Sequence, residues 1–222
     1  DRVFLLTAVP AGSSLPESHR PLGGVNPRGV HRFVVMALDR RDGRVVWERT
    51  AREEAPHEAS HQDNGTWASS SAMTDGEHVI ASFESRGIYA YDMNGKLVWQ
   101  KDLGDKSMRS EFGEGSTPVL YKNHLVVVWD HTKGSFVTVL DKNTGKELWR
   151  VSRNEIDTWA TPYVVENAGR AQVIGWLRQR SRWLKGFLQT WLVHMRQPAR
   201  LLEEVGVAGF WACQAYTVGL VA

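Results

Sequence analysis

The stretch "VLDKNTGKELWRV", residues 139–151, contains the pattern that decides the fold. Two apolar residues lead into Asp141, a short polar segment ends in Gly145, and Trp149 follows after a basic residue. Glycine supplies the positive φ that a tight turn needs, and Asp and Asn side chains bond the backbone of such turns. The stretch therefore predicts a β-hairpin with Trp149 on its returning strand.

The same pattern occurs three times in the chain. The other copies are "ALDRRDGRVVWER" (37–49) and "AYDMNGKLVWQK" (90–101), and the three tryptophans are 52 and 50 residues apart. A fixed spacing of this size indicates a repeat protein. The repeated positions are Asp39, Gly43 and Trp47, then Asp92, Gly95 and Trp99, then Asp141, Gly145 and Trp149.

A second element precedes each hairpin position, at 66–83, 115–129 and 158–174. Each copy has a short Ser/Thr/Pro segment, an apolar strand, a polar turn and another apolar strand. One period of about 50 residues thus holds about four strands, which is typical of a propeller blade. Because blades cover one another, we expect the repeated Trp to pack between neighbouring blades.

The hairpin, written A-x-D-x-x-T-G-K-x-x-W, resembles the repeat of pyrroloquinoline quinone (PQQ)-type β-propellers. Residues 139–149 match best, whereas 37–47 carry Asp42 where that family usually has Thr. The resemblance covers about residues 30–174. It implies a mainly β fold, a partial propeller of about three four-stranded blades within a domain over 1–174. Because such rings close with about seven or eight blades, we expect a piece of a larger ring.

From Gly175 onward the apolar spacing becomes helical and is sustained to Pro198. Trp, Phe and Leu alternate with Arg and Lys, a pattern that favours a helix at a membrane interface. Residues 205–222 then carry no charge, which is nearly enough for a membrane span. We therefore expect a second domain over 175–222, an α-helical membrane-interface tail with the start of a transmembrane helix.

The tail motif "QRSRW" (179–183) resembles the Q-x-x-R-W region of membrane-bound family 2 glycosyltransferases. The resemblance implies substrate-binding roles for Gln179, Arg182 and Trp183, with the arginine facing a nucleotide-sugar diphosphate. The Asp-x-Asp metal site of those enzymes is missing from the chain. We expect no glycosyl transfer. The two halves meet near 173–176, either through a join of unrelated coding fragments or as an evolved fusion.

Charge is uneven along the chain. Residues 175–222 hold six Lys/Arg and two Asp/Glu, so the tail is basic and the remainder mildly acidic. This balance does not indicate a nucleic-acid binder. The single cysteine, Cys213, excludes an internal disulfide.

Four side chains are weak candidates for a cofactor or metal. His57 and His61 are four residues apart, but Pro56 and a polar turn favour a surface loop over a metal site. Trp67 and Trp159 each precede a blade strand, where quinone stacking competes with blade packing as an explanation. Further loop positions between blades are Arg109, Glu111, Glu114 and 157–159.

Three functions follow as hypotheses. The first is a non-catalytic binding or scaffold module, exported by resemblance, that binds a protein or small ligand on the propeller face. The second is a fragment of a PQQ-dependent dehydrogenase using PQQ with Ca²⁺. The third is a remnant of a membrane glycosyltransferase that contacts the membrane through its tail. We expect no cofactor, no bound metal and no enzymatic activity in this chain.

Overall fold

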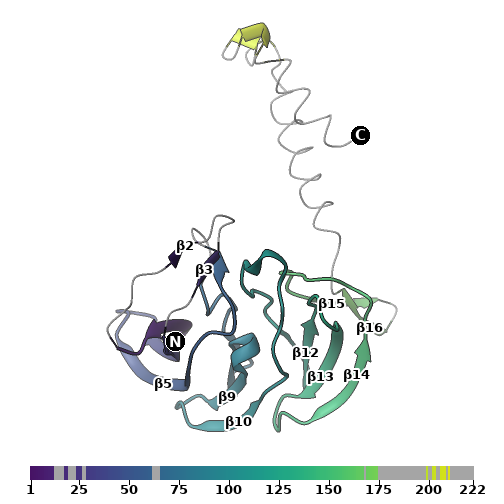
Figure 1. Cartoon of the computed structure of the whole chain (residues 1–222). Coiled ribbons are helices and arrows are strands. Elements are labelled where there is room, and N and C mark those ends of the chain that lie inside the picture. The colour runs from purple at the N-terminus through teal and green to yellow at the C-terminus, as the bar shows by residue number, and fades with distance from the viewer. Residues whose placement is uncertain are drawn as a thin grey trace. The chain divides into compact units, whose positions relative to one another are not determined.

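The computed structural model divides the chain into two compact units, Asp1–Gly175 and Trp176–Ala222. The first unit is mainly β and is built from antiparallel sheets that follow one another along the chain (Figure 1). The few described positions of the second unit are helical. The structure describes residues 1–12, 18–19, 24–26, 29–61, 66–167, 169–174, 199, 202–203, 206–208 and 210.

The first sheet has three strands in the order β1-β4-β5. Its strands are β1 (Arg2–Pro10), β4 (His31–Asp39) and β5 (Val45–Glu54). In β4, Phe33, Val35 and Ala37 lie on one face of the strand and are buried, and Val34 on the other face is buried as well. A small separate sheet, β2-β3-β6, comprises β2 (Ser18–His19), β3 (Gly24–Asn26) and β6 (Ser60–His61).

The second and third sheets are four-stranded meanders as expected, whereas the first sheet has three strands rather than the expected four. The second consists of β7 (Met73–Thr74), β8 (His78–Ser82), β9 (Ile88–Asp92) and β10 (Leu97–Lys101). The third consists of β11 (Val119–Tyr121), β12 (His124–Trp129), β13 (Phe136–Asp141) and β14 (Glu147–Ser152). Two short 3-10 turns, Glu84–Arg86 and Arg109–Glu111, lie in the connections.

A fourth, two-stranded sheet comprises β15 (Tyr163–Asn167) and β16 (Arg170–Ile174). The first strands of successive sheets contact one another, β7 with β11 and β11 with β15. By position, β15 and β16 correspond to the first two strands of a blade. The first unit is therefore a partial propeller of three blades and the beginning of a fourth.

Each core cluster lies between two neighbouring blades. The first joins Phe33, Val35 and Trp47 to β8 and β9 residues of the next blade. The second joins Ile80, Ile88 and Trp99 to residues of the third blade. Stability in such a stack comes largely from these neighbour contacts.

The repeated Asp and Gly shape the turn at the end of each hairpin. In the third copy, Asp141 accepts backbone N–H bonds from Asn143 and Thr144 at 3.1 and 2.9 Å, and Gly145 donates to the Asp141 carbonyl at 2.9 Å. Gly145 has φ +69, a left-handed conformation that side chains disfavour. The corresponding glycines, Gly43 and Gly95, also have positive φ.

Two of the repeated tryptophans contact the turn of the following blade. The Trp47 indole N–H donates to the Met93 carbonyl at 3.0 Å, and that of Trp99 donates to the Lys142 carbonyl at 2.7 Å. Each indole lies so close to the turn glycine that an added Cβ would meet it at 2.7 Å for Gly95 and 2.6 Å for Gly145. Glycine is thus needed at this turn position for two reasons: its positive φ, and the close approach of the indole, which leaves no room for a Cβ.

Among the residues that the structure describes, the third tryptophan has no such neighbour. Trp149 is 46% exposed, against 7% for both Trp47 and Trp99. At the other end of the unit, the turn glycine Gly43 has nothing within 4 Å of an added Cβ. Within the described residues, the repeated contact is therefore made twice and left open at both ends.

A β-bulge lies just before each repeated tryptophan. The pairing register between the two strands of each hairpin shifts at this place. The shift falls between Ala37 and Leu38 in the first copy, between Leu97 and Trp99 in the second, and between Val139 and Leu140 in the third. Bulges re-aim side chains. Residues just before each indole are left exposed, as with Val98 and Leu148, both at 46%.

The expected membrane tail lies almost wholly outside the described residues. In the part of the chain that the structure does describe, no helix has the length and apolar character needed to cross a bilayer.

Candidate functional site

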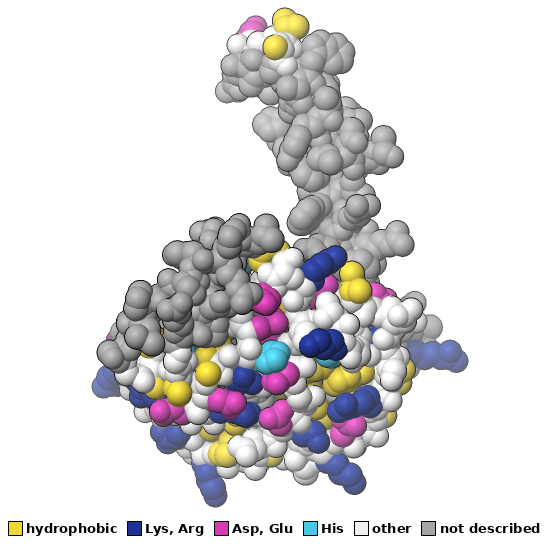
Figure 2. Space-filling view, in the orientation of Figure 1, with side chains coloured by type: hydrophobic (Ala, Val, Ile, Leu, Met, Phe, Trp, Pro, Cys, Tyr) yellow, Lys and Arg dark blue, Asp and Glu magenta, His cyan; other side chains and the backbone are white. Residues whose placement is uncertain are grey.

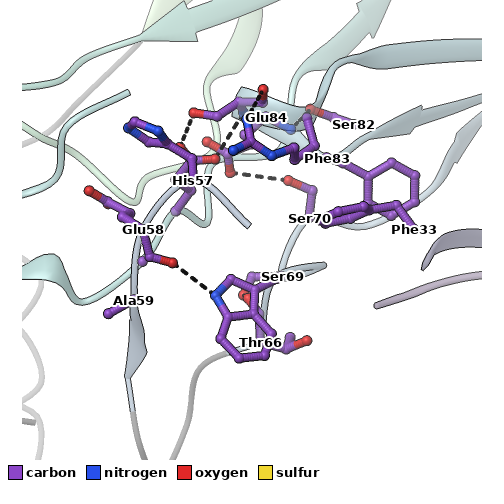
Figure 3. Close-up of a pocket in the computed structure, with 15 residues that line it drawn as sticks. Phe33, His57, Glu58, Ala59, Thr66, Ser69, Ser70, Ser82, Phe83 and Glu84 are labelled. Atoms are coloured by element: carbon purple, nitrogen blue, oxygen red, sulfur yellow. Dashed lines mark hydrogen bonds between the residues drawn. The ribbon is translucent and has the colours of Figure 1, made fainter. Parts of the chain in front are cut away.

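A cavity opens between the first two blades, at the end where the inter-blade loops meet (Figure 3). About 30 Å³ of it is open to water. Its wall combines aromatic side chains with hydroxyls and carboxylates, among them Phe33, Ser70, Glu58, Glu84 and Glu114. A larger hollow in the described part of the chain, of about 600 Å³, is lined among others by Asp1, Arg2, Asp39 and Arg44.

Lys106 supplies a buried positive charge beside this cavity. Its side chain is 1% exposed and forms an ion pair with Glu84, whose side chain is 5% exposed. The ammonium also lies 4.9 Å from the ring centroid of Trp129, which adds a cation–π contact. Because a buried carboxylate needs a compensating charge, Lys106 supplies the counter-charge for Glu84.

Glu114 is a second carboxyl group in the same cluster. It accepts the Ser85 backbone N–H at 2.9 Å and is bonded to the Ser85 hydroxyl. Burial, and then the nearby charge of Glu84, raise the pKa of Glu114 to about 8. A pKa near 8 leaves Glu114 largely protonated at neutral pH.

Serine hydroxyls complete the network. Ser70 bonds a Glu84 carboxylate oxygen at 3.3 Å, as Figure 3 shows. The Lys106 backbone N–H donates to the Ser85 hydroxyl at 2.8 Å. Ser116, from the following loop, donates its hydroxyl to the Ala160 carbonyl at 3.1 Å. The network thus connects loops from successive blades.

Two further carboxylates tie neighbouring loops together. Glu58 accepts the Met108 backbone N–H at 3.2 Å, and burial raises the pKa of Glu58 to about 7. Asp157 accepts the Arg109 backbone N–H at 2.9 Å and pairs with the Arg109 guanidinium at 3.3 Å. Both acids bond backbone positions of the loop that contains Met108 and Arg109, so their first role is to fix the loops.

The two candidate stacking tryptophans take part in the same loop packing. Trp67 lines the cavity, donates its indole N–H to the Glu58 carbonyl at 3.0 Å and meets His31 edge-on at 4.7 Å. Trp159 donates to the Gly113 carbonyl at 2.7 Å. Both rings are half-buried. Trp159 reaches back to the preceding inter-blade loop, whereas Trp67 bonds within its own connection between β5 and β7.

The two candidate metal-binding histidines have different neighbours. His57 lies at the cavity and its ring nitrogen is 3.3 Å from an Asp105 carboxylate oxygen. His61 belongs to β6, and its ring lies 5.4 Å from that of Phe112. Their loop is irregular rather than helical, as expected from Pro56.

One group of three potential metal ligands occurs in the described part of the chain: Asp75, Glu77 and His78. Lys142 pairs with Asp75 and also lies 3.7 Å from Glu77. A lysine thus already balances this exposed acidic group.

The remaining candidates, Gln179, Arg182 and Trp183, lie outside the described residues. Conversely, the sequence had not singled out Glu84, Ser85 or Lys106. Each stands in a polar loop without periodicity, where charged residues usually face solvent. Only the structure shows that these three side chains are buried together.

Charge on the visible face is mixed. Figure 2 shows acidic and basic side chains interspersed over the first unit, with no single basic patch on the face drawn. A nucleic-acid surface requires clustered Lys and Arg.

Known structures offer distant similarities. BamB from Moraxella catarrhalis is 18% identical, with 75% of this chain and 58% of that chain covered and a TM-score of 0.41. Quinohemoprotein alcohol dehydrogenase ADHIIG from Pseudomonas putida HK5 is 20% identical, over 67% of this chain and 22% of that one, with a TM-score of 0.39. A europium-containing methanol dehydrogenase is 16% identical, over 67% and 27%, also with a TM-score of 0.39.

The chain therefore spans from 22% to 58% of the length of these three proteins. No curated protein sequence matches it. A family model described as outer membrane protein assembly factor BamB matches residues 31–175, which is more than half of the chain. With its repeated hairpins and four-stranded blades, the chain belongs to this family of PQQ-like repeat proteins.

Proposed function

We propose that this chain is a non-catalytic PQQ-like repeat module that is exported and binds another protein through its inter-blade loops. The observation that carries the proposal is the buried Lys106–Glu84 pair beside the cavity. It supplies internally the positive charge that a cofactor-binding carboxylate site would take from a metal ion. The family description, an outer membrane assembly factor, supports a protein partner and an exported location.

The size of the cavity supports the same proposal. A volume of 30 Å³ holds about two or three water molecules, because one water needs about 10–15 Å³ by this measure. Pockets for cofactors and drug-sized ligands have volumes of about 300–1,000 Å³. The described cavity is therefore suited to water and to loop packing.

Photo-crosslinking in the native host tests the protein-binding role. A photoreactive amino acid replaces Phe112, which is 37% exposed in the loop between the second and third blades, or Val98, which is exposed at the opposite end of a blade. We expect Phe112 to yield a defined adduct with an envelope protein and Val98 to yield none. If neither position forms an adduct, or if both capture the same set of proteins, the loops are not a specific binding face.

A quinoprotein fragment is the second candidate, and the place of Trp67 in the cavity wall favours it. Full-length protein is mixed with PQQ and Ca²⁺, and dye reduction is followed with alcohols and sugars. We expect no reduction above the quinone alone. Activity that disappears in Trp67→Ala would support the second candidate instead.

A third candidate, the glycosyltransferase remnant with a membrane-associated tail, is supported by the sequence resemblance of residues 175–222. Flotation with anionic liposomes tests the tail. The full chain is expected to float, and the triple variant Arg178→Glu, Arg180→Glu, Arg182→Glu is expected to stay at the bottom. Equal behaviour of both proteins would exclude a basic membrane-binding helix.

A further inference from the structure

Residues 106–109, in the connection between β10 and β11, are held through their backbone by side chains from four other connections. Each of their four successive N–H groups donates to one such side chain. The pairs are Lys106 with the Ser85 hydroxyl (2.8 Å), Ser107 with the His131 ring nitrogen Nδ1 (3.3 Å), Met108 with the Glu58 carboxylate (3.2 Å) and Arg109 with the Asp157 carboxylate (2.9 Å). Irregular backbone at this end of the blades is thus fixed at four consecutive positions.

His131 makes the second of these four bonds and is itself firmly placed. The ring belongs to a residue that is 8% exposed, and its backbone N–H donates to the Ser135 hydroxyl at 3.0 Å. The next residue, Thr132, donates its backbone N–H and its hydroxyl to the Ser107 carbonyl at 3.0 and 2.8 Å. Since Nδ1 accepts the Ser107 N–H, this nitrogen carries no proton and the ring is neutral.

A proton on Nδ1 would turn this acceptor into a donor that faces the N–H of Ser107. It would also add a positive charge among cations. Burial, and then the charge of Lys106, lower the pKa of His131; Lys133 and His57 act in the same direction, and a backbone hydrogen bond of Gly134 opposes them. The acids of the surrounding connections have other partners: Asp130 pairs with Arg153, Glu84 with Lys106, and Glu58 and Asp157 bond the backbone of Met108 and Arg109.

The two residues that follow the segment show that its conformation is imposed from outside. Ser110 and Glu111 have φ of +59 and +52, in the left-handed region that side chains disfavour. Successive residues of this kind persist when the surrounding structure holds them in place. Release of residues 106–109 would let both relax to ordinary backbone angles.

We propose that residues 106–109 form an acid-sensitive latch, in which protonation of His131 breaks its bond to Ser107 and releases the segment that leads to Phe112. Above about pH 6.5, the ordinary pKa of histidine, the ring is neutral in both states and the latch is closed. As the pH falls below this value, the released ring takes up a proton more readily than the closed one, so the equilibrium shifts towards release. The release does not depend on the function proposed above; only an effect on partner binding rests on it.

Hydrogen exchange of the full chain measures the release directly. Fragmentation of the labelled peptides resolves the amides of 106–109, and the rates are corrected for the intrinsic effect of pH on exchange. We expect the protection of the Ser107 amide to fall between pH 7.5 and pH 5.0 by about threefold to thirtyfold, the upper figure being the limit for one proton over the 1.5 pH units below 6.5. The amides of 125–128, in the buried strand β12, should keep their protection.

Three variants separate the titration of His131 from its packing. His131→Asn places an amide oxygen near the position of Nδ1 and takes up no proton, so protection of Ser107 should be the same at both pH values. His131→Leu removes the acceptor and should leave the amide weakly protected throughout. His124→Asn changes the histidine that begins β12 and should retain the wild-type dependence on pH.

A wild-type protection that does not change with pH would overturn the proposal. So would a fall of equal size in His131→Asn, which would assign the release to another group, or a simultaneous fall at 125–128, which would mean general unfolding. An NMR titration of the wild-type imidazole needs no variant: His131 should titrate below 6.5, and a value at or above 6.5 would contradict the latch. Because none of these readouts requires a partner, the latch and the proposed protein-binding role succeed or fail separately.

Discussion

Lys106 holds a buried positive charge between Glu84 and the ring of Trp129. In Lys106→Met, the Glu84 carboxylate would remain buried without a counter-charge. Breaking one side of a buried pair costs about 3–5 kcal/mol, so we expect a loss of that size in the free energy of unfolding. Urea denaturation measures it.

Two controls separate this effect from general damage. The double variant Lys106→Met, Glu84→Gln removes both charges and should recover most of the stability. Lys133→Met alters an exposed lysine and should change the free energy of unfolding by less than about 0.5 kcal/mol. A loss that the double variant does not relieve would mean that Lys106 acts through packing rather than charge.

Glu114 makes stability depend on pH. Its pKa is raised from the ordinary 4.5 to about 8 in the folded protein, so between these values the folded state holds a proton that the unfolded state has released. The contribution of Glu114 to the free energy of unfolding is therefore largest below about pH 4.5 and falls as the pH rises towards 8. Glu58, with its pKa raised to about 7, acts in the same direction.

Glu114→Gln mimics the protonated carboxyl at every pH. We expect its unfolding midpoint to vary less between pH 5 and pH 9 than that of the wild type, and to exceed the wild-type value at pH 9. Thermal scans across this range give both curves. Parallel curves for the two proteins would show that Glu114 loses its proton at an ordinary pKa.

At the scale of elements, the turn glycines offer a matched pair. An alanine at Gly145 would place its Cβ 2.6 Å from Trp99, whereas at Gly43 the Cβ would meet nothing within 4 Å. Both residues have positive φ, +69 for Gly145 and +74 for Gly43. An alanine at either position therefore carries a similar backbone cost of about 1–2 kcal/mol. We expect Gly43→Ala to cost that amount and Gly145→Ala clearly more, as measured by urea denaturation. Equal costs would show that the indole contact adds nothing.

The repeat in the sequence predicted the mainly β fold and the four-stranded blades, because a period of about 50 residues and the turn residues are local signals. It did not predict the bulge before each tryptophan, which depends on how two strands pair. The long insertion between β1 and β4 also hid their pairing, since that contact joins residues distant in the chain.

The polar site was less accessible to sequence reasoning. Glu114 lies in a loop between blades, and its partner Ser85 lies 29 residues earlier in the β8–β9 connection. Lys106 and Glu84 are 22 residues apart, one in the loop after β10 and the other in the β8–β9 connection. Local patterns do not encode such encounters, because they depend on how the loops fold back over the blade rather than on any one strand.

At the scale of the whole molecule, the first unit is a stack in which each blade contacts only its neighbours. Its stability should then be roughly a sum of blade and interface contributions. The repeated tryptophan-to-turn contact is the common element of those interfaces, made by Trp47 and Trp99 and left open at Trp149. The repeated tryptophan therefore contributes a different amount to the free energy of unfolding in each blade, depending on whether another blade packs against it.

The most direct measurement is the free energy of unfolding of Trp99→Ala beside that of Trp149→Ala, both by urea denaturation of the full chain. Loss of a buried tryptophan costs about 3–5 kcal/mol, and an exposed substitution stays within about 0.5 kcal/mol. The account predicts a loss of about 3–5 kcal/mol for Trp99→Ala and of no more than about 0.5 kcal/mol for Trp149→Ala. Equal losses in the two variants would contradict the stack of blades open at Trp149.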